Sequence, residues 1–181
     1  MEETEKTTLT PRDIMLRYGL ICGAVAILFV AILYAIDSKL LFGYYAYIGF
    51  VATFTVAVLA AVARKKNNDG YISYGDSVVT SLAAFSIGEV LYTLFMLLMY
   101  FVIDPHLVDK MRSVQMERMD QMLANGTINK VQYTAAQTSI DNINANSILF
   151  YSIMGVIIII IISLLIFLLT SIFIKNEKSP V

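Results

Sequence analysis

Charged residues, histidine and cysteine are all scarce in this sequence. Asp, Glu, Lys and Arg make up 15% of its 181 residues, whereas a typical soluble domain carries about 25%. Cys22 is the only cysteine, which excludes an internal disulfide and a metal site built from several cysteines. His106 is the only histidine, so catalytic dyads that need histidine are nearly excluded by counting.

The known sequence signatures of enzymes are also missing. The chain has no phosphate-binding glycine loop, no nucleophile elbow and no cluster of metal ligands. Its formal net charge of -1 gives no sign of a nucleic-acid-binding surface. We therefore predict a non-enzymatic protein without cofactor or metal that does not bind nucleic acid. A membrane enzyme using carboxylates of the longest loop is the open alternative.

Apolar residues are what the sequence has in excess. They make up 58% of the chain and give a mean hydropathy of +0.72, so the protein needs lipid around it. A helix must contain roughly 20 mostly apolar residues to cross a bilayer. Four runs meet this requirement: Tyr18–Ile36, Leu40–Ala63, Val78–Ile103 and Ile148–Ile174. We predict an all-α integral membrane four-helix bundle, a single membrane domain over residues 1–181, with these runs as transmembrane helices 18–36, 40–63, 78–103 and 148–174.

The first apolar run differs from a cleaved signal peptide. The segment before it carries the acidic residues Glu2, Glu3, Glu5 and Asp13, which suit a signal peptide poorly. The run is long, and no small-residue cleavage site follows it. We therefore expect this helix to be retained in the membrane.

The distribution of Lys and Arg predicts the orientation in the membrane. Eight of the 13 basic residues lie on the side of the termini. The other five lie on the opposite side, where they are spread over a longer stretch of chain. The eight are Lys6, Arg12, Arg17, Arg64, Lys65, Lys66, Lys175 and Lys178. We read Arg64, Lys65 and Lys66 as the main topology signal. The bias predicts a multi-pass protein of the cell inner membrane with both termini in the cytoplasm.

The connection over residues 104–147 is the only sizeable part outside the predicted spans. Asp104 and Pro105 are typical of a helix start, and Asn125-Gly126 of a helix end. Thr127 or Asn129 can cap a second helix, which could run straight into the fourth span. Apolar residues at helical spacing predict the inward faces: Leu107, Met111, Val114, Met119 and Met122, then Val131, Ala135, Thr138 and Ile143. We predict a short extracytoplasmic helical hairpin on the outer ends of the third and fourth spans.

The remaining connections are short. Residues 37–39 form a tight link that makes the first two spans an antiparallel hairpin. Residues 67–70 form a turn, and Gly75-Asp76-Ser77 offers a cap for the third helix.

Several motifs are shared with a known family of membrane proteins. They are Arg17-Tyr18-Gly19-Leu20, the basic end Arg64-Lys65-Lys66, the Gly70–Gly75 segment, Ile103-Asp104-Pro105 and a break at Gly126–Gln132. In this order and spacing the chain resembles a bacterial family of small four-helix membrane proteins, the domain-of-unknown-function 4199 family. The resemblance implies the topology and brings no activity. That family usually has a small or apolar residue where this chain has Glu89, so the resemblance implies no role for Glu89.

Glu89 is the most unusual residue, because it lies near the middle of the third span. No Lys, Arg or His lies inside any span, and an ionised carboxylate there costs about 2.5–3.5 kcal/mol on insertion scales. Burial therefore favours the neutral acid. Ser86 and Thr93 share its helix face and complete a candidate intramembrane polar site. One hypothesis is interhelical hydrogen bonding to hydroxyl groups, which Glu89→Gln would preserve and Glu89→Leu would lose. The other is proton coupling or ligand binding.

Small residues form two motifs at four-residue spacing, Gly19 with Gly23 and Ala84 with Gly88. Such pairs let helices approach closely. They predict helix packing within the bundle or, alternatively, a dimer interface.

The methionines of residues 104–147 suggest three uses. Met111, Met116, Met119 and Met122 could pack the hairpin, present an adaptable surface to a partner or, with His106, bind a soft metal. Packing is the simplest explanation, because only some of them lie one helical turn apart.

Two functions remain open. The favoured one is interaction, as a scaffold, subunit or lipid-contacting protein of the bilayer with a protein partner or as a homo-oligomer. The alternative is a small transporter or channel that uses the Glu89 face. A conducting path needs a continuous polar lining, and the fourth span offers only Ser152, Ser163 and its ends.

Overall fold

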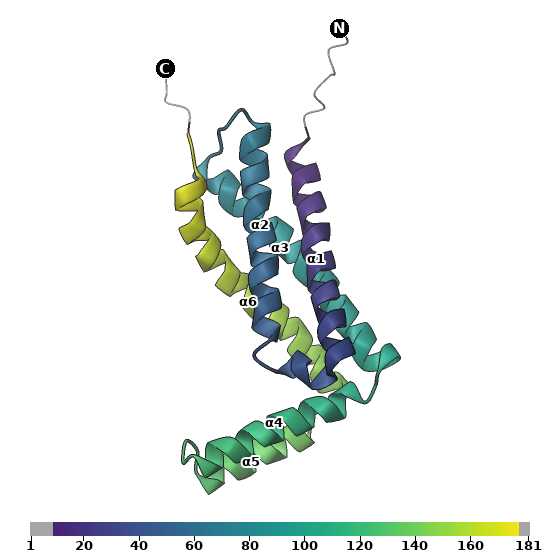
Figure 1. The fold of residues 1–181 in the computed structure, drawn as a ribbon. Coiled ribbons are helices and arrows are strands. Elements are labelled where there is room, and N and C mark those ends of the chain that lie inside the picture. Colours follow the sequence, from purple (N-terminus) through teal and green to yellow (C-terminus); the bar gives the residue numbers. More distant parts are fainter. Residues whose placement is uncertain (1–8, 178–181) are drawn as a thin grey trace.

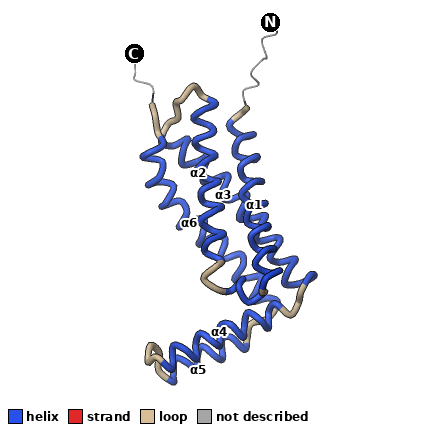
Figure 2. Tube along the Cα trace, in the orientation of Figure 1, coloured by secondary structure: helices blue, strands red, loops and turns tan. Residues whose placement is uncertain are grey.

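The described part of the chain, residues 9–177, is all-α in the computed structural model (Figure 1). Short loops join its helices, and within these residues the only β pairing is an isolated bridge between Ile72 and Asn176 (Figure 2). The helices are α1 (Pro11–Ile36), the 3-10 turn η1 (Ser38–Phe42), α2 (Ala46–Asn67), α3 (Tyr74–Leu98), the π turn η2 (Met99–Ile103), α4 (Leu107–Ala124), α5 (Lys130–Asp141) and α6 (Ala145–Ile174). Lys6 and Lys178 of the charge count lie outside the described residues.

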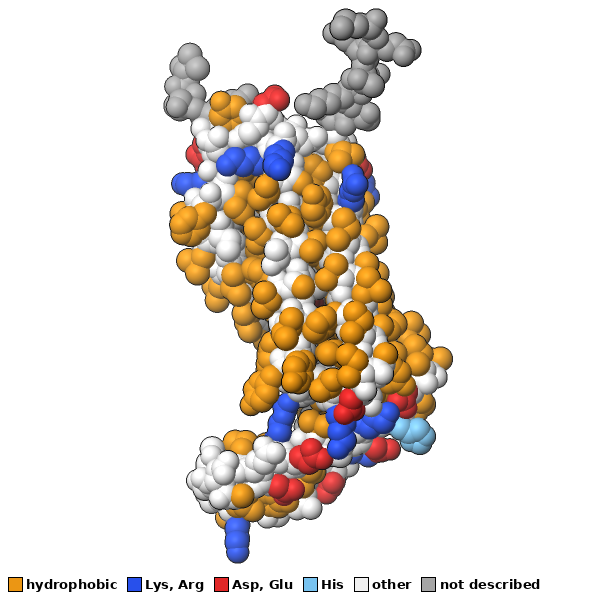
Figure 3. Space-filling model, in the orientation of Figure 1, with side chains coloured by type: hydrophobic (Ala, Val, Ile, Leu, Met, Phe, Trp, Pro, Cys, Tyr) orange, Lys and Arg blue, Asp and Glu red, His pale blue; other side chains and the backbone are white. Residues whose placement is uncertain are grey.

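Four of the described helices are long and apolar enough to cross a membrane. They are α1, α2, α3 continued through η2, and α6, with hydropathy between 1.9 and 3.3 in their most apolar stretches. Figure 3 shows the corresponding apolar band between two charged ends. The prediction of an all-α chain with four helices long and apolar enough to cross a membrane is confirmed for the described residues.

The first helix begins earlier than the apolar run. Thr10 and Asp13 form a capping box, in which the Asp13 N–H donates to Thr10 Oγ1 at 3.2 Å. Capping satisfies the free N–H groups of the first turn. The polar residues before Tyr18 are therefore already helical.

The second predicted span is wrong at its start. The first residues of the 40–63 range belong to η1 and the following turn, and α2 begins only at Ala46 and continues to Asn67. The Asp37 carboxylate accepts the Lys39 N–H at 2.9 Å and caps η1. This local cap produces a separate short helix that hydropathy does not distinguish from the span.

The cap predicted for the third helix is also wrong. Ser73, which precedes Gly75-Asp76-Ser77, is the N-cap, and its hydroxyl accepts the Asp76 N–H at 3.1 Å. Three consecutive residues could have capped this helix, and the chain uses the serine before them. At the other end, α3 passes into η2 rather than continuing as a regular helix to Ile103.

The predicted hairpin over residues 104–147 is present as α4 and α5. Asn125-Gly126 ends α4, with Gly126 at φ +70°, and Asn129 caps α5 in a capping box with Gln132. Two details differ. The Asp104 carboxylate accepts the His106 N–H at 3.1 Å and so caps a turn that precedes α4. The helix α4 itself begins at Leu107. α5 does not run into α6, because Asn144 starts α6 with its own cap.

The hairpin buries a different face of α5 from the predicted one. On the α4 side the prediction is closer, with Leu107 fully buried. On the α5 side Val131 is 78% exposed, and Ala135 and Thr138 are also exposed. Ile140 at the end of α5, which was not predicted to be buried, and Ile143 just after it are buried and form a cluster with Ile148. Only Ile143 of the predicted α5 stripe is buried.

Of the four long helices, α3 is central and contacts the other three, α1, α2 and α6. α2 and α6 contact each other only sparsely. The first turns of α1 and the last turns of α6 lie at one end of this helical body, and the α4–α5 hairpin crosses the opposite end (Figure 1). Lys39 of η1 pairs with Glu117 of α4 at 3.1 Å, so the hairpin also contacts the link between α1 and α2.

Candidate functional site

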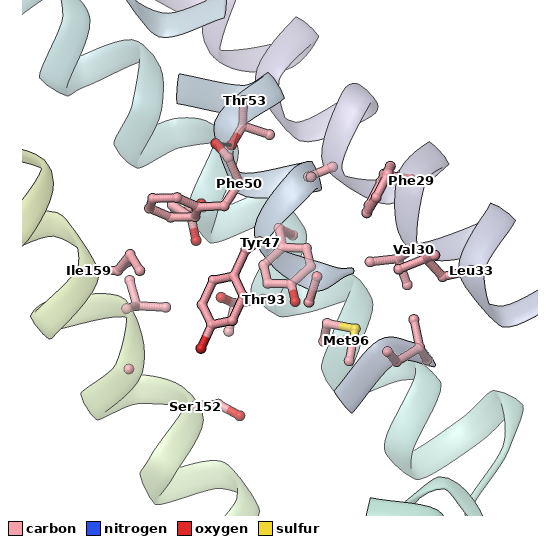
Figure 4. A pocket seen from close by; sticks show the side chains of 18 of the residues that line it. Phe29, Val30, Leu33, Tyr47, Phe50, Thr53, Thr93, Met96, Ser152 and Ile159 are labelled. Carbon is pink, nitrogen blue, oxygen red and sulfur yellow. Dashed lines mark hydrogen bonds between the residues drawn. The ribbon is translucent and has the colours of Figure 1, made fainter. Parts of the chain in front are cut away.

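A cavity of about 460 Å³ lies in the half of the helical body nearest the hairpin. Its wall comes from the second halves of α1 and α3, the first halves of α2 and α6, and residues of η1 and η2 (Figure 4). The volume falls within the usual range of small-molecule sites, about 300–1,000 Å³. The wall is mostly apolar, with a few hydroxyl groups and a single carboxyl group.

The carboxyl group is that of Glu89, which is 8% exposed. It forms no hydrogen bond or ion pair with any residue in the described part of the chain. Hydroxyl groups in the spans of other helices donate to their own helix: Thr53 to the Phe50 carbonyl at 2.9 Å, Thr55 to Val51 at 2.8 Å and Ser163 to Ile160 at 2.8 Å. The hydrogen-bonded interhelical contact predicted for Glu89 is thus absent from this structure.

Hydroxyl groups approach the cavity from three helices. Figure 4 shows Thr53 on α2, Thr93 on α3 and Ser152 on α6, with Val30 and Leu33 of α1 on the opposite side from Ile159 of α6. Thr93 follows Glu89 by one helical turn, so the predicted shared face is a wall of the cavity. Ser86 is half-buried and does not line it.

An aromatic cluster fills the core next to the cavity. Phe54 of α2 stacks on Phe167 of α6 with ring centroids 4.4 Å apart. Phe85 of α3 meets both rings edge-on, and Phe50 joins the cluster at the cavity. These rings close the space between α2 and α6 on the side away from the hairpin.

The cavity wall is open to the surroundings between α2 and α6. Tyr47 on α2 is 68% exposed and Tyr151 on α6 is 64% exposed, and both line the cavity. Gly155, inside the isoleucine-rich part of α6, is exposed, and a Cβ atom there would meet nothing within 4 Å. Because this surface belongs to the apolar band, the opening faces the region that lipid would occupy.

The small residues predicted for helix packing lie at the contact between α1 and α3. A Cβ atom on Gly19 would lie 2.7 Å from Ile87, and one on Gly23 2.7 Å from Leu91. On the facing helix, a Cβ atom on Gly88 would lie 2.5 Å from Cys22. Ala84 is fully buried on the same helix. These motifs therefore serve contacts within the chain.

The basic segment at the end of α2 joins three elements. Arg64 pairs with the Asp76 carboxylate at 2.6 Å and donates to the Thr80 hydroxyl at 2.8 Å. Lys65 donates to the Ile174 carbonyl at the end of α6 at 2.8 Å, whereas Lys66 is exposed. The predicted topology signal thus also holds α2 to α3 and α6.

The methionines of the hairpin are used in its own packing. Met111, Met116 and Met119 pack on the buried isoleucine cluster that joins α5 to α6. The Tyr100 hydroxyl lies 4.0 Å from the Met111 sulfur, at the junction with η2.

Sequence reasoning found Glu89 and missed most of the cavity. Its other wall residues lie on α1, α2 and α6, and no periodic pattern connects them across the chain. Gly155 was the one signal in the sequence, since a glycine next to a run of isoleucine is unusual. In the structure a Cβ atom at this position would meet nothing within 4 Å.

The fold and this site together define a class: a small all-α protein with four helices long and apolar enough to cross a membrane, a helical hairpin and a cavity among the apolar helices. The family model described as "Protein of unknown function (DUF4199)" matches residues 17–176. The chain belongs to this family. No curated protein and no solved structure matches it.

Proposed function

We propose that this chain is a non-enzymatic integral membrane protein that binds a membrane-soluble small molecule in the Glu89 cavity. The observation that carries the proposal is a buried carboxyl group that faces a cavity and has no protein partner. Buried polar groups in proteins are nearly always hydrogen-bonded, because an unpaired one costs about 1–3 kcal/mol. A bound molecule can supply the missing partner.

The cavity supports binding over conduction. It opens sideways toward the apolar surroundings, and the Phe54–Phe167 stack closes it on the side away from the hairpin. A channel or transporter pathway would need a polar route past these rings. The transporter or channel hypothesis drawn from the sequence therefore has less support than small-molecule binding.

The interaction role favoured by the sequence also has less support. The surface predicted to adapt to a partner was the group of methionines in residues 104–147. Three of these methionines pack inside the hairpin. Exposed faces of α4 and α5 remain for a partner, and a protein partner is one outcome of the experiment below.

We further propose a bacterial inner-membrane location, with a four-helix bundle, both termini in the cytoplasm and the α4–α5 hairpin outside it. The basic residues at the end of α2 and beside the ends of α1 and α6 support this orientation. The hairpin lies at the opposite end of the helical body.

The experiment is gentle purification of the native protein from its own membrane, followed by native mass spectrometry. We expect a small molecule bound at stoichiometric amounts to wild type and to Gly155→Ala. Gly155→Phe should release it, because the phenyl group can occupy the opening while its Cβ atom meets no neighbour within 4 Å. A stoichiometric protein partner without a small molecule would contradict ligand binding and restore the interaction role.

A further inference from the structure

We infer that the molecule bound in the Glu89 cavity is a hydrophobic organic cation, an alkylammonium in chemical class. This inference rests on the proposed function, since it names the ligand of the same cavity. It is carried by the side chains that line the wall, by their charge and by the direction of the opening.

The charge of the wall favours a cation. Glu89 is the only residue with a formal charge among the lining side chains, and no Lys, Arg or His lines the cavity. An anionic ligand would meet a carboxyl group with no compensating cation. A cation bound there would pair with the ionised carboxylate, the single carboxyl group in the wall of the cavity.

The aromatic content of the wall favours the same ligand. Six aromatic residues line the cavity: Phe29, Tyr47, Phe50, Tyr92, Tyr100 and Tyr151. The face of an aromatic ring attracts a cation within about 6 Å, and more strongly once water is excluded. Aromatic cages are the usual means by which proteins hold alkylammonium groups, and here the wall carries both aromatic residues and a carboxyl group.

The remaining wall suits an alkyl chain. Val30, Leu33 and Leu41 lie on one side and Val156 and Ile159 on the other, with the opening at Gly155 between α2 and α6. An amphiphile could enter from the apolar region, place its headgroup beside Glu89 and leave its tail along these side chains or in the opening. A permanently charged ammonium is the simplest probe, since it cannot lose its charge to the site.

The experiment is equilibrium dialysis of decyltrimethylammonium against the full-length protein in nanodiscs, with empty nanodiscs as the blank for partition into lipid. Decanol and decyl sulfate serve as neutral and anionic probes of the same chain length. We expect saturable binding of the ammonium at one site per chain and no saturable binding of the sulfate. Glu89→Gln should weaken ammonium binding at least about tenfold, because it removes the negative charge that the trimethylammonium group pairs with, and leave decanol binding unchanged.

The other variants separate the two proposals. Gly155→Phe should abolish saturable binding of both decanol and the ammonium. Gly75→Phe should behave as wild type, because Gly75 lies outside the cavity and a Cβ atom there also meets nothing within 4 Å. If Glu89→Gln binds the ammonium as well as wild type does, or if the sulfate binds equally, the ligand class is overturned and the cavity remains a binding site. If no probe binds in a way that Gly155→Phe abolishes, the proposed function fails with it.

Discussion

Glu89 is buried in the helical body without the hydrogen bonds that would make it a structural contact. Its carboxyl group faces a cavity, and the Thr53 hydroxyl of α2, which lines the same cavity, donates to its own backbone. A side chain that stabilises no neighbour is costly to bury. Its presence is therefore better explained by a bound molecule than by the stability of the bundle.

An unpaired Glu89 carboxyl group has consequences for two substitutions in the ligand-free protein. Glu89→Leu should leave the thermal midpoint of the ligand-free protein unchanged or raise it, because it replaces an unpaired polar group with an apolar one. Glu89→Gln should stay close to wild type. Differential scanning fluorimetry in detergent measures both. A clear loss of stability in Glu89→Leu alone would support the interhelical hydrogen bonding predicted from the sequence and contradict the account.

Asp104 is the residue that joins the hairpin to the spanning helices. Its carboxylate accepts the Lys110 ammonium at 2.9 Å and the Tyr34 hydroxyl at 3.1 Å. The hydrogen bond from Lys110 holds the pKa of Asp104 below its ordinary value of 3.8. The same contact raises the pKa of Lys110 above 10.5.

These directions set the pH range over which the hairpin is held in place. A carboxyl with a lowered pKa stabilises the fold above its ordinary pKa and loses this effect as the pH falls through the folded value. A lysine with a raised pKa loses its effect as the pH rises through its folded value. Hydrogen-exchange protection of α4 should thus be constant near neutral pH and fall below about pH 3.8. Lys110→Met should have lower protection at neutral pH, and equal protection in this variant would contradict the pairing.

At the scale of the elements, the contact between α1 and α3 depends on glycine. Gly88→Val should lower the free energy of unfolding by about 1–3 kcal/mol, the usual cost of overfilling a packed contact. The reason is that a Cβ atom there would already lie 2.5 Å from Cys22. Gly155→Val is the matched control, since it adds the same side chain where nothing lies within 4 Å. Equal midpoints for the two variants in thermal unfolding would refute the assigned contact.

The elements also show what a sequence can predict in a membrane protein. The four apolar helices and the hairpin follow from hydropathy and turn residues, because lipid admits few other structures. The boundaries do not, since Thr10, Asp37 and Ser73 cap their helices by local hydrogen bonds that hydropathy ignores. The inward face of α5 was mispredicted because this helix is buried only near its end, where Ile140 clusters with Ile143 and Ile148 at the junction with α6.

The cavity could not be predicted for a related reason. Its wall joins residues of α1, α2, α3 and α6 that are brought together only by the packing angles of the helices. The sequence identified Glu89 and Thr93 by their chemistry and shared face. The rest of the wall depends on tertiary structure.

At the scale of the whole molecule, the orientation in the membrane can be tested with introduced cysteines. Cys22 is fully buried, so wild type should not react with a membrane-impermeant maleimide. Thr127→Cys at the tip of the hairpin should react on intact spheroplasts, and Asn68→Cys in the α2–α3 link should react only after the membrane is opened. The reverse pattern would contradict a hairpin outside the cytoplasm.

The central proposal for the whole molecule is that the helical body surrounds a cavity that opens toward lipid and binds a small molecule there. The most direct measurement is photo-crosslinking with a decylammonium probe that carries a diazirine, in nanodiscs, followed by mapping of the labelled peptides. The account predicts labelling of residues 46–53 of α2, 151–159 of α6 and Glu89, and its loss in Gly155→Phe. Labelling spread over the outer faces of α1 and α6 and unchanged in Gly155→Phe would contradict it.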